Sequence, residues 1–578
     1  MSYTHFILNG LKIEIKQDSY LAKVTGIDGN DKNIFIPNTI SYDSHVYLIT
    51  SIKKKSFKRN RDIEYIQFGD CSGLRCFEKA AFEKSSLRKI VIPRHVHTIE
   101  QRCFSFCHNL QKIEFPLDSE LEIIEHGAFF DSHIESITIP SNLKEIGYEA
   151  FYNCLNLSQI NFAPNSELNS IDTSAFCCCN FNHITLPPHL TTISCKTFAQ
   201  CRNLKTIEFS EGSELTTIEK KAFQDSSIET LSIPSQVQNL NCGWCLGTYK
   251  LKHILISPRN NFFSYVNDEM MIEKNDLNDD FYENLVFVRR DIEQFVIPSF
   301  ITKIKPYAFS ECRKLKKLEI PKDSKLTTIE EKAFYNSFIE SITIPSSVEY
   351  LQDGWLKLFT LKNLSIDSNN KFYRYYNDKL LIGTFGNSIS FAKEGIECLI
   401  VPSFINRIDS YVFYKCKSLK EIIFFDDSQL CYIGKEAFTE TSLESIIIPP
   451  KVSFIGVAAF YYCISLRKIS FAENSQIETI GKDAFSSTPV LNMTIPPSVR
   501  YIKDAFYTCD ELKTIEFLSD RFYDNICLYG CRCLFLVSFP NVKEISIDLS
   551  DVNENISFFV NVKTNLYSKF HDFENSAF

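Results

Sequence analysis

The chain has 578 residues, enough for several ordinary domains or for one elongated array of repeats. Phenylalanine occurs 50 times, whereas methionine (4), tryptophan (2) and glycine (18) are scarce, which is typical of a repeat that requires one aromatic residue at the same site again and again. The net charge of -9 and the lack of any run of five like charges argue against a nucleic-acid partner.

The N-terminal stretch MSYTHFILNGLKIEIKQDSY has no basic flank followed by an apolar core, which a secretory signal requires. The best later apolar run, LFLVSF at residues 534–539, is far shorter than the roughly 20 residues that span a bilayer. We therefore expect neither an export signal nor a membrane span. Residues 1–52 are predicted to form a capping β segment.

From residue 53 onward, two spacings recur. Strand-like segments that end in proline follow one another every 47 residues, and phenylalanines between them alternate at spacings of 25 and 22 residues. The repeat unit is therefore a pair of turns, one long and one short. The prolines are Pro93, Pro140, Pro187 and Pro234, then Pro298 and Pro345, then Pro402, Pro449 and Pro496; the phenylalanines run from Phe57 through Phe82, Phe104, Phe129, Phe151, Phe176 and Phe198 to Phe223.

Each turn contains the pattern L/I-x-x-I-x-I/F, a strand whose inward positions alternate with outward polar ones, and then a small residue followed by phenylalanine. One such turn cannot bury its own apolar edge and needs stacked neighbours. We predict a leucine-rich-repeat solenoid of about 17 turns at the ~4.8 Å strand spacing. The predicted fold is a right-handed superhelix with one continuous parallel β-sheet, short helical turns and two β-hairpin insertions.

The two insertions are copies of each other. Residues 243–272 align with residues 354–382, and Trp244 matches Trp355, the second of the two tryptophans. Each copy ends in an aromatic strand, an Asn-Asp pair and an apolar strand, which predicts a β-hairpin. The domains expected are a cap (1–52), repeats (53–243), a first insertion (244–300), repeats (301–354), a second insertion (355–404), repeats (405–515), and a degenerate repeat with a C-terminal cap (516–578).

The pattern I-P-x-x-V-x-x-I-x-x-x-A-F-x-x-C occurs as IPPKVSFIGVAAFYYC (Ile448–Cys463) and IPSNLKEIGYEAFYNC (Ile139–Cys154). Over roughly residues 10–515 the sequence resembles the BspA-like leucine-rich-repeat family of microbial surface proteins. The resemblance implies a non-catalytic surface antigen or adhesin at the cell surface. Its implied partners are protein ligands, possible examples being host or matrix proteins.

Cysteines mark one corner of the long turns, three residues after the phenylalanine. Equivalent corners two turns apart lie roughly 10 Å from each other, beyond the ~7 Å Cα limit for a disulfide. Cys154, Cys179 and Cys201 occupy this corner on three successive turns and could pair if oxidised. Unpaired thiols and the missing signal favour the cytoplasm, so a cytosolic scaffold or regulator is the alternative function.

The Cys-x-x-Cys of Cys242 and Cys245 suggests a thiol redox protein or half of a metal site. The second insertion has Asp353 and Leu356 in these places, so we interpret the Gly-Trp pair as the structural element and the cysteines as incidental. No catalytic motif, metal site or cofactor site is recognised, and we predict that the chain is not an enzyme.

The hairpins are the predicted site of partner binding, because they add aromatic side chains that the repeat itself does not need. The alternative is that these side chains pack back on the solenoid. The outward strand face, with mixed lysine and glutamate, is expected to be solvated, and serine-centred tips such as PNSE and EGSE could form a row that collects cations. The candidate partner-binding residues are Phe262, Phe263, Tyr265, Phe372, Tyr373, Tyr375 and Tyr376.

Overall fold

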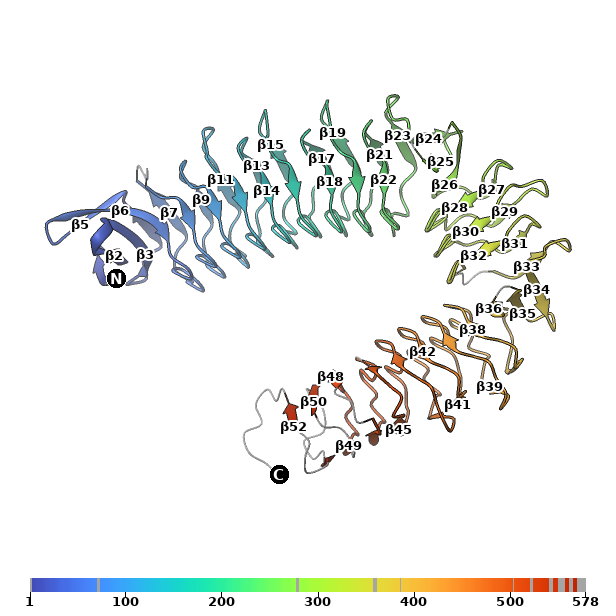
Figure 1. The fold of residues 1–578 in the computed structure, drawn as a ribbon. Coiled ribbons are helices and arrows are strands. Elements are labelled where there is room, and N and C mark those ends of the chain that lie inside the picture. The colour runs from blue at the N-terminus through green and yellow to red at the C-terminus, as the bar shows by residue number, and fades with distance from the viewer. Residues whose placement is uncertain are drawn as a thin grey trace. The chain divides into compact units, whose positions relative to one another are not determined.

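The computed structural model describes residues 3–69, 73–276, 280–356, 361–384, 386–502, 504–519, 523–539, 544–548, 557–560 and 565–568. The chain divides into two compact units. The first comprises Met1–Gln294 with Lys305–Leu315, and the second comprises Phe295–Ile304 with Lys316–Phe578. Each unit is a solenoid of stacked turns, which we call rungs, coloured blue to green and yellow-green to red in Figure 1.

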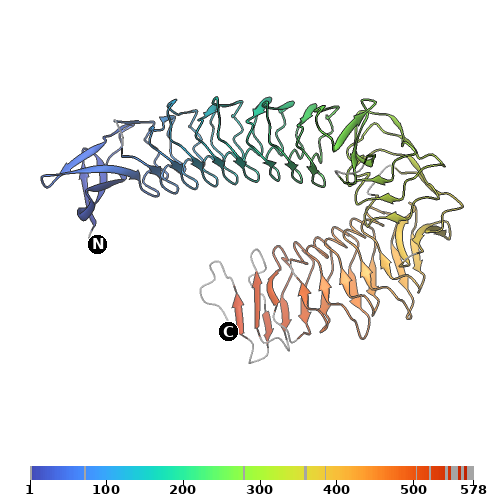
Figure 2. The ribbon, with the colours of Figure 1, turned by 45° about the horizontal axis from the view of Figure 1, so that its top comes forward.

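Each rung of the first unit contributes one long strand to a parallel ladder (Figure 2). Along these strands inward and outward side chains alternate: Ile137 and Ile139 are buried, whereas Thr138 between them is exposed. β-Branched residues suit this half-buried, pleated surface. The long strands are β4 (Asn33–Ile36), β7 (Tyr65–Phe68), β9 (Lys89–Val91), β11 (Lys112–Glu114), β13 (Ser136–Ile139), β15 (Gln159–Phe162), β17 (His183–Leu186), β19 (Thr206–Phe209), β21 (Thr230–Ile233) and β23 (His253–Ile256).

A second parallel ladder is formed by two-residue strands that follow the tip of each rung. In each pair the second residue is usually a buried isoleucine, as in Ile99 and Ile124. These strands are β8 (Cys76–Phe77), β10 (Thr98–Ile99), β12 (Ile123–Ile124), β14 (Glu145–Ile146), β16 (Ser170–Ile171), β18 (Thr192–Ile193), β20 (Thr217–Ile218) and β22 (Asn239–Leu240).

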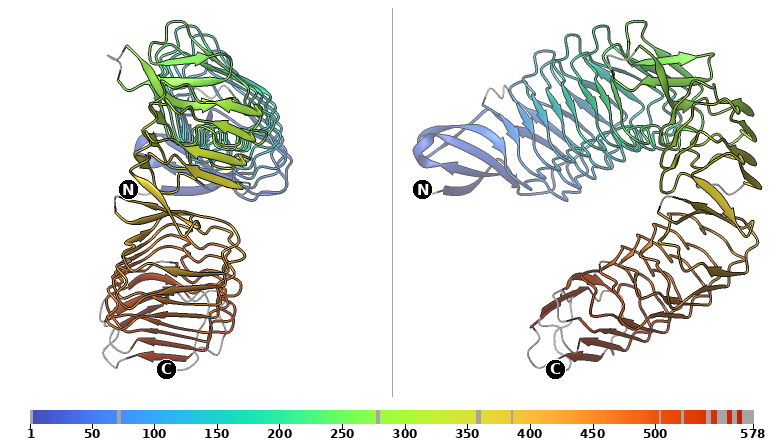
Figure 3. Two further views of the ribbon diagram at one scale, coloured as in Figure 1. Left: turned by 90° about the vertical axis from the view of Figure 1, so that its right-hand side faces the viewer. Right: turned by 45° about the vertical axis from the view of Figure 1, so that its right-hand side comes forward.

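The second unit repeats this plan, and Figure 3 shows its rungs stacked in the same manner. The long strands are β27 (Gln294–Val296), β29 (Lys317–Glu319), β31 (Ser341–Ile344), β33 (Asn363–Ile366), β37 (Cys398–Val401), β39 (Glu421–Phe424), β41 (Ser445–Ile448), β43 (Lys468–Phe471), β45 (Asn492–Ile495), β47 (Thr514–Phe517), β49 (Leu536–Phe539) and β51 (Ser557–Val560). The companion strands are β28 (Lys303–Ile304), β30 (Thr328–Ile329), β32 (Tyr350–Leu351), β38 (Arg407–Ile408), β40 (Tyr432–Ile433), β42 (Phe454–Ile455), β44 (Thr479–Ile480), β46 (Tyr501–Ile502), β48 (Tyr523–Cys527), β50 (Glu544–Asp548) and β52 (Asn565–Ser568).

The described strands amount to about 22 rungs, more than the 17 predicted. The lead-in, both insertions and the region after residue 515 each contribute long strands that the phenylalanine spacing does not mark. The expectation of one continuous sheet is also wrong. The long-strand ladder is interrupted between β15 and β17 in the first unit, and between β33 and β37, β39 and β41, and β43 and β45 in the second. Twist between neighbouring short strands is the physical reason we assign to these breaks.

The predicted short helical turns are not helical. Apart from the 3-10 segment η1 (Gln17–Ser19), the described ranges contain no helix. The residues two before and two after each ladder phenylalanine adopt left-handed backbone angles, as Arg102 (φ 57°) and Phe106 (φ 59°) do around Phe104. The Phe104 N–H then donates to the Ala128 carbonyl of the next rung (2.7 Å). Because these backbone bonds run between rungs, an i to i−4 helical ladder cannot form.

Phenylalanine rings stack in a column within each solenoid, from Phe57 to Phe223 in the first unit and from Phe413 to Phe506 in the second. Phe129 stacks on Phe104 with 5.3 Å between ring centroids and on Phe151 with 5.0 Å, and all three are fully buried. In the second unit Phe438 stacks in the same way on Phe413 and Phe460, each at 5.1 Å. This confirms the prediction that the same aromatic site recurs along the repeats.

Both predicted hairpins are present, and each is extended by a third antiparallel strand. The Asn267-Asp268 and Asn377-Asp378 pairs have φ between 48° and 54°, as two-residue hairpin turns of the primed type require. The first set is β24 (Phe263–Val266), β25 (Met270–Lys274) and β26 (Tyr282–Val288); the second is β34 (Tyr373–Tyr376), β35 (Leu380–Gly383) and β36 (Ser388–Ala392). Residues 277–279 of the acidic loop in the first insertion lie outside the described ranges.

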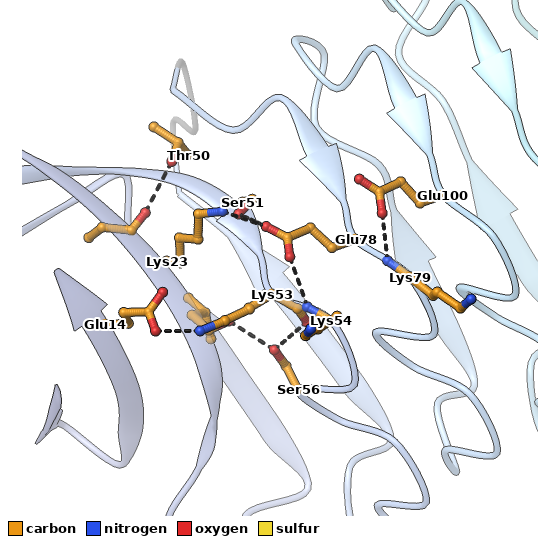
Figure 4. Close-up of polar contacts among 12 residues, drawn as sticks. Glu14, Lys23, Thr50, Ser51, Lys53, Lys54, Ser56, Glu78, Lys79 and Glu100 are labelled. Atoms are coloured by element: carbon orange, nitrogen blue, oxygen red, sulfur yellow. Dashed lines mark hydrogen bonds and ion pairs between the residues drawn. The ribbon is translucent and has the colours of Figure 1, made fainter. Parts of the chain in front are cut away.

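The N-terminal cap consists of β1 (Tyr3–Leu8), β2 (Leu11–Lys16), β3 (Leu21–Ile27), β5 (Thr39–Tyr42) and β6 (His45–Ile52), and it joins the short-strand ladder through β6 and β8. Glu78 fastens this junction: its carboxylate accepts from Lys23 Nζ (2.8 Å) and from the Lys54 backbone N–H (3.1 Å), as Figure 4 shows. One rung further, Glu100 accepts from the Lys79 N–H (2.8 Å). An acidic residue after the short strand thus holds the backbone of the preceding rung.

Buried thiols at the rung corner also link neighbouring rungs. Cys154, Cys179 and Cys201 each donate to the carbonyl of a phenylalanine one rung earlier, at 3.1 to 3.2 Å. No disulfide joins cysteines within the described ranges. These small buried side chains therefore make hydrogen bonds between rungs, and pairing of the three on oxidation stays a prediction.

We expect the unfolding free energy of the first unit to fall with pH between about pH 9 and 11, because burial raises the pKa of the Cys107 thiol from 9.0 to about 11 and that of Cys154 to about 12. The folded state keeps these protons while the unfolded state loses them, so the stabilisation is complete below pH 9 and is lost above it. Urea midpoints at pH 8 and pH 10.5 test this. A Cys107→Ser, Cys154→Ser variant should lose less stability over that interval, and an identical loss in both proteins contradicts the assignment.

Candidate binding surfaces

The hairpin aromatic residues lie against the solenoid more than they face solvent. Phe263 and Tyr373 are buried, and the other five are partly buried. The Tyr265 hydroxyl donates to the Lys252 carbonyl (3.2 Å) and the Tyr375 hydroxyl to the Leu364 carbonyl (2.7 Å). Burial raises the pKa of Tyr375 to about 12. These contacts give the aromatics a structural role in seating each hairpin, and their role in partner binding stays a prediction.

The Cys-x-x-Cys of the first insertion is not a matched pair of thiols. Cys242 is exposed, whereas Cys245 is buried and occupies the place of a ladder phenylalanine. The register follows from a backbone hydrogen bond, in which the Phe223 N–H donates to the Trp244 carbonyl. In other rungs this carbonyl belongs to the small residue that precedes the ladder phenylalanine, so Cys245, the residue after Trp244, takes the phenylalanine position. Trp244 and Trp355 are both buried and meet the last ladder phenylalanine before each insertion edge to face.

Cys245 contacts a buried arginine. Arg290 Nη2 donates to Cys245 Sγ (3.3 Å), and its Nη1 donates to the Ala308 carbonyl (3.0 Å) and lies 3.7 Å from Cys312 Sγ. The guanidinium also lies 4.4 Å from the centre of the Phe287 ring. Our interpretation of this cysteine as incidental is therefore wrong. The sequence signal that we missed lies in the alignment of the two insertions, in which Cys245 aligns with Leu356 and Arg290 aligns with Glu394.

Burial raises the pKa of the Cys245 thiol, although the Arg290 charge acts in the opposite direction. A redox thiol requires a lowered pKa and access to its substrate. We therefore expect iodoacetamide at pH 7.5 to modify Cys242 in the folded protein and to leave Cys245 unmodified, as read by peptide mass spectrometry. A urea-unfolded sample provides the control, in which both thiols react. Equal labelling of both in the folded protein would refute this assignment.

The serine-centred tips do not form a row of exposed cation ligands. Ser119, Ser166 and Ser428 are almost fully buried. The Ser119 hydroxyl accepts from the Leu121 N–H (3.3 Å), and Ser428 accepts from Leu430 in the same way. These serines close the tip locally. Across the described ranges, no grouping of three histidine, cysteine or acidic side chains is suited to a metal ion.

The outward strand face of the first unit is polar and cross-linked by charge pairs, as expected. Glu114 on β11 forms ion pairs with Lys112 (2.6 Å) and with Lys89 on the adjacent rung (2.9 Å). These contacts lower the pKa of the Glu114 carboxyl, first through the hydrogen bond from Lys112. Such exposed pairs contribute little stability each, and they leave the face neutral and solvated.

The second unit has an outward surface that our sequence interpretation missed. Ile400, Ile423 and Ile447 lie at the same outward position of β37, β39 and β41, with 53%, 39% and 62% of their surface exposed. Ile400 and Ile423 are register partners in the ladder. A groove of about 460 Å³ is lined by Ile423 and Ile447 and by Phe425, which is half exposed. The sequence signal is the third residue of CLIV, EIIF and SIII, since this outward position is isoleucine in all three strands.

Within the described part of the chain, no helix is both long and apolar enough to cross a bilayer. Stacked parallel rungs around a buried phenylalanine column define the class of protein as a leucine-rich-repeat β-solenoid. The sequence matches the description "BspA type Leucine rich repeat region" over residues 32–158, 122–244, 282–380, 384–513 and 431–557. The chain therefore belongs to the BspA-type leucine-rich-repeat family, as the sequence pattern predicts. It matches none of the curated proteins with which it was compared.

Several solved structures are similar. A leucine-rich cell surface protein from Faecalibacterium prausnitzii is 18% identical, with 82% of this chain and 96% of that chain covered and a TM-score of 0.41. A leucine-rich repeat protein from Eubacterium ventriosum is 16% identical, with coverages of 85% and 96% and a TM-score of 0.34. The pneumococcal vaccine antigen PcpA is 14% identical, with coverages of 98% and 94% and a TM-score of 0.24.

Proposed function

We propose that this chain is a non-catalytic protein-binding module, a surface antigen or adhesin of the BspA-like kind, that binds protein ligands through the exterior of its solenoid. The observation that carries the proposal is the run of outward strand positions, which repeats on every rung of a rigid ladder. Rigid, repeated surfaces of this type suit extended protein ligands. Membership of a family whose repeats are typically non-catalytic binding modules supports the same function.

A photo-crosslinking experiment tests the proposal. A crosslinking residue is placed at outward positions of each unit, Thr138 and Thr343, at the exposed hairpin residue Arg374, and at the exposed turn residue Lys482 as the control. The purified variants are applied to intact source cells and to the cells that these contact, and also to lysates of both. The proposal expects one or more defined proteins to be captured from strand-face positions and not from Lys482. Capture that is equal at all four positions, or none at any, refutes it.

The second candidate is a cytosolic scaffold or regulator that uses the same exterior. The many buried cysteines favour it, because none of those in the described ranges is in a disulfide. Labelling intact cells with a membrane-impermeant reagent separates the two candidates. An antigen or adhesin is labelled before lysis, whereas a cytosolic scaffold is labelled only after lysis.

A further inference from the structure

The outward apolar side chains of the second unit form a continuous patch. We call Ile400, Ile423, Ile447 and Phe425 the isoleucine patch. Elsewhere, exposed apolar residues at the position equivalent to Ile423 have polar register partners: Phe35 pairs with Gln67, Val91 with Glu114 and Leu255 with Ser232. Monomeric soluble proteins rarely expose contiguous apolar patches larger than about a few hundred Å², whereas scattered single apolar residues are normal. The patch is therefore the part of the strand face that differs from a solvated ladder.

The patch lines a groove at a place where the long-strand ladder is interrupted. β37 pairs with β39 and β41 pairs with β43, but β39 and β41 belong to different sheets. The groove of about 460 Å³ is lined by both strands, through Ile423 of β39 and Ile447 of β41. The buried Ile422 and Ile446 lie below it. An apolar side chain from a partner can pack in the groove against Ile423 and Ile447.

The rim of the groove is acidic. Glu421, Asp426 and Glu473 line it and are exposed, and its lining includes no lysine or arginine. None of the three carboxylates forms an ion pair with a residue in the described ranges, unlike Glu114 on the first unit. Two lysines flank the lining: Lys420 directly precedes Glu421 in the chain, and Lys468 is the register partner of Ser445 on β41. The apolar groove thus carries a net negative rim that a partner must neutralise.

We infer that this groove binds a segment of a partner protein in which apolar side chains alternate with lysine or arginine. This inference rests on the proposed protein-binding function and specifies its site and partner chemistry. The apolar side chains contact Ile423 and Ile447, and the flanking cations reach Asp426 and Glu473. Complementary charge at the edge of a contact favours encounter and selects the partner. A second copy of this chain is disfavoured, because a two-fold contact would place two acidic rims against each other.

The test uses the full chain and a fluorescein-labelled synthetic heptapeptide of alternating lysine and leucine, with fluorescence anisotropy as the readout. Matched peptides alternate glutamate with leucine, and lysine with serine. Three variants are compared: Ile423→Ser with Ile447→Ser, Asp426→Asn with Glu473→Gln, and the control Val296→Ser with Glu319→Gln, which changes exposed residues at the same kind of position. Circular dichroism and thermal unfolding confirm that each variant is folded.

The inference expects the lysine–leucine peptide to bind with at least about tenfold higher affinity than either matched peptide. The isoleucine variant should lose about tenfold or more, the carboxylate variant about threefold to tenfold, and the control less than twofold. Raising the salt concentration from 0.05 to 0.5 M should weaken binding to the unaltered chain and change little for the carboxylate variant. Absence of binding, or equal binding to all three variants, overturns the inference.

Three further outcomes test the occupant of the groove and separate this inference from the proposed function. If sedimentation shows a dimer that the isoleucine variant abolishes, the occupant is a second copy and the inference is wrong. If the strand-face crosslinkers capture the same proteins from the unaltered chain and from the isoleucine variant, protein binding stands and the assignment of this groove fails. If no position captures a protein while the heptapeptide still binds selectively, the proposed function fails and the groove chemistry stands.

Discussion

The Phe129→Ala variant is expected to lower the unfolding free energy of the first unit by about 3–5 kcal/mol, the range for buried phenylalanine. Phe129 is fully buried and stacks on rings at 5.3 Å and 5.0 Å, so its removal leaves a cavity and interrupts the aromatic column on both sides. Because each rung contacts only its neighbours, the loss concentrates on the adjoining rungs. Amide hydrogen exchange, resolved by residue, measures this local opening together with the urea midpoint.

The matched control for this substitution is Phe35→Ala. Phe35 lies at an outward position of β4 in the same unit and is 57% exposed. Its removal is expected to change stability by about 0.5 kcal/mol or less, since it leaves no cavity. If the two variants lose equal stability, or if protection in the rungs of Phe104 and Phe151 is unchanged by Phe129→Ala, the aromatic column does not hold the rungs together.

The second large effect is expected at a column of glycines in the second unit. A Cβ added at Gly456 would lie 2.6 Å from the Gly434 carbonyl carbon and from the Lys435 nitrogen, and a Cβ at Gly481 would meet the Gly456 backbone at the same distance. These neighbours are backbone atoms of the next rung, so relief requires the rungs to separate. We expect Gly456→Ala to destabilise the unit by about 1–3 kcal/mol, the usual cost of overpacking.

The sign of that effect is informative, because Gly→Ala in a compatible backbone usually stabilises by about 0.4–1 kcal/mol through the unfolded state. Gly69→Ala is the control, since its Cβ would meet no atom closer than 3.4 Å. The unfolding free energies of the two variants, measured by thermal and urea unfolding, should shift in opposite directions from that of the unaltered chain or differ from each other by at least about 1 kcal/mol. A Gly456→Ala protein as stable as the unaltered chain would mean that the rungs do not approach as closely as the structure places them.

The sequence predicted the repeat well, because periodicity is a local property. Spacings of 25 and 22 residues locate the ladder phenylalanines, the alternation in each strand locates the buried isoleucines, and the Asn-Asp pairs locate the two hairpin turns. The same pattern led to the correct family. Turn geometry was less accessible, since the left-handed residues beside Phe104 are an arginine and a phenylalanine, which carry no strong preference for that conformation.

What the sequence by itself determined is the set of apolar positions that must be buried, and hence a stacked solenoid with an aromatic column. Only the tertiary structure decided which side chains on different rungs meet. It placed Arg290 between Cys245 and Cys312, turned the hairpin aromatics toward the solenoid, and brought Ile400, Ile423 and Ile447 together beside the carboxylates of Glu421, Asp426 and Glu473. The physical reason is that contacts between rungs depend on register and on breaks in the ladder, and no single turn of sequence contains either.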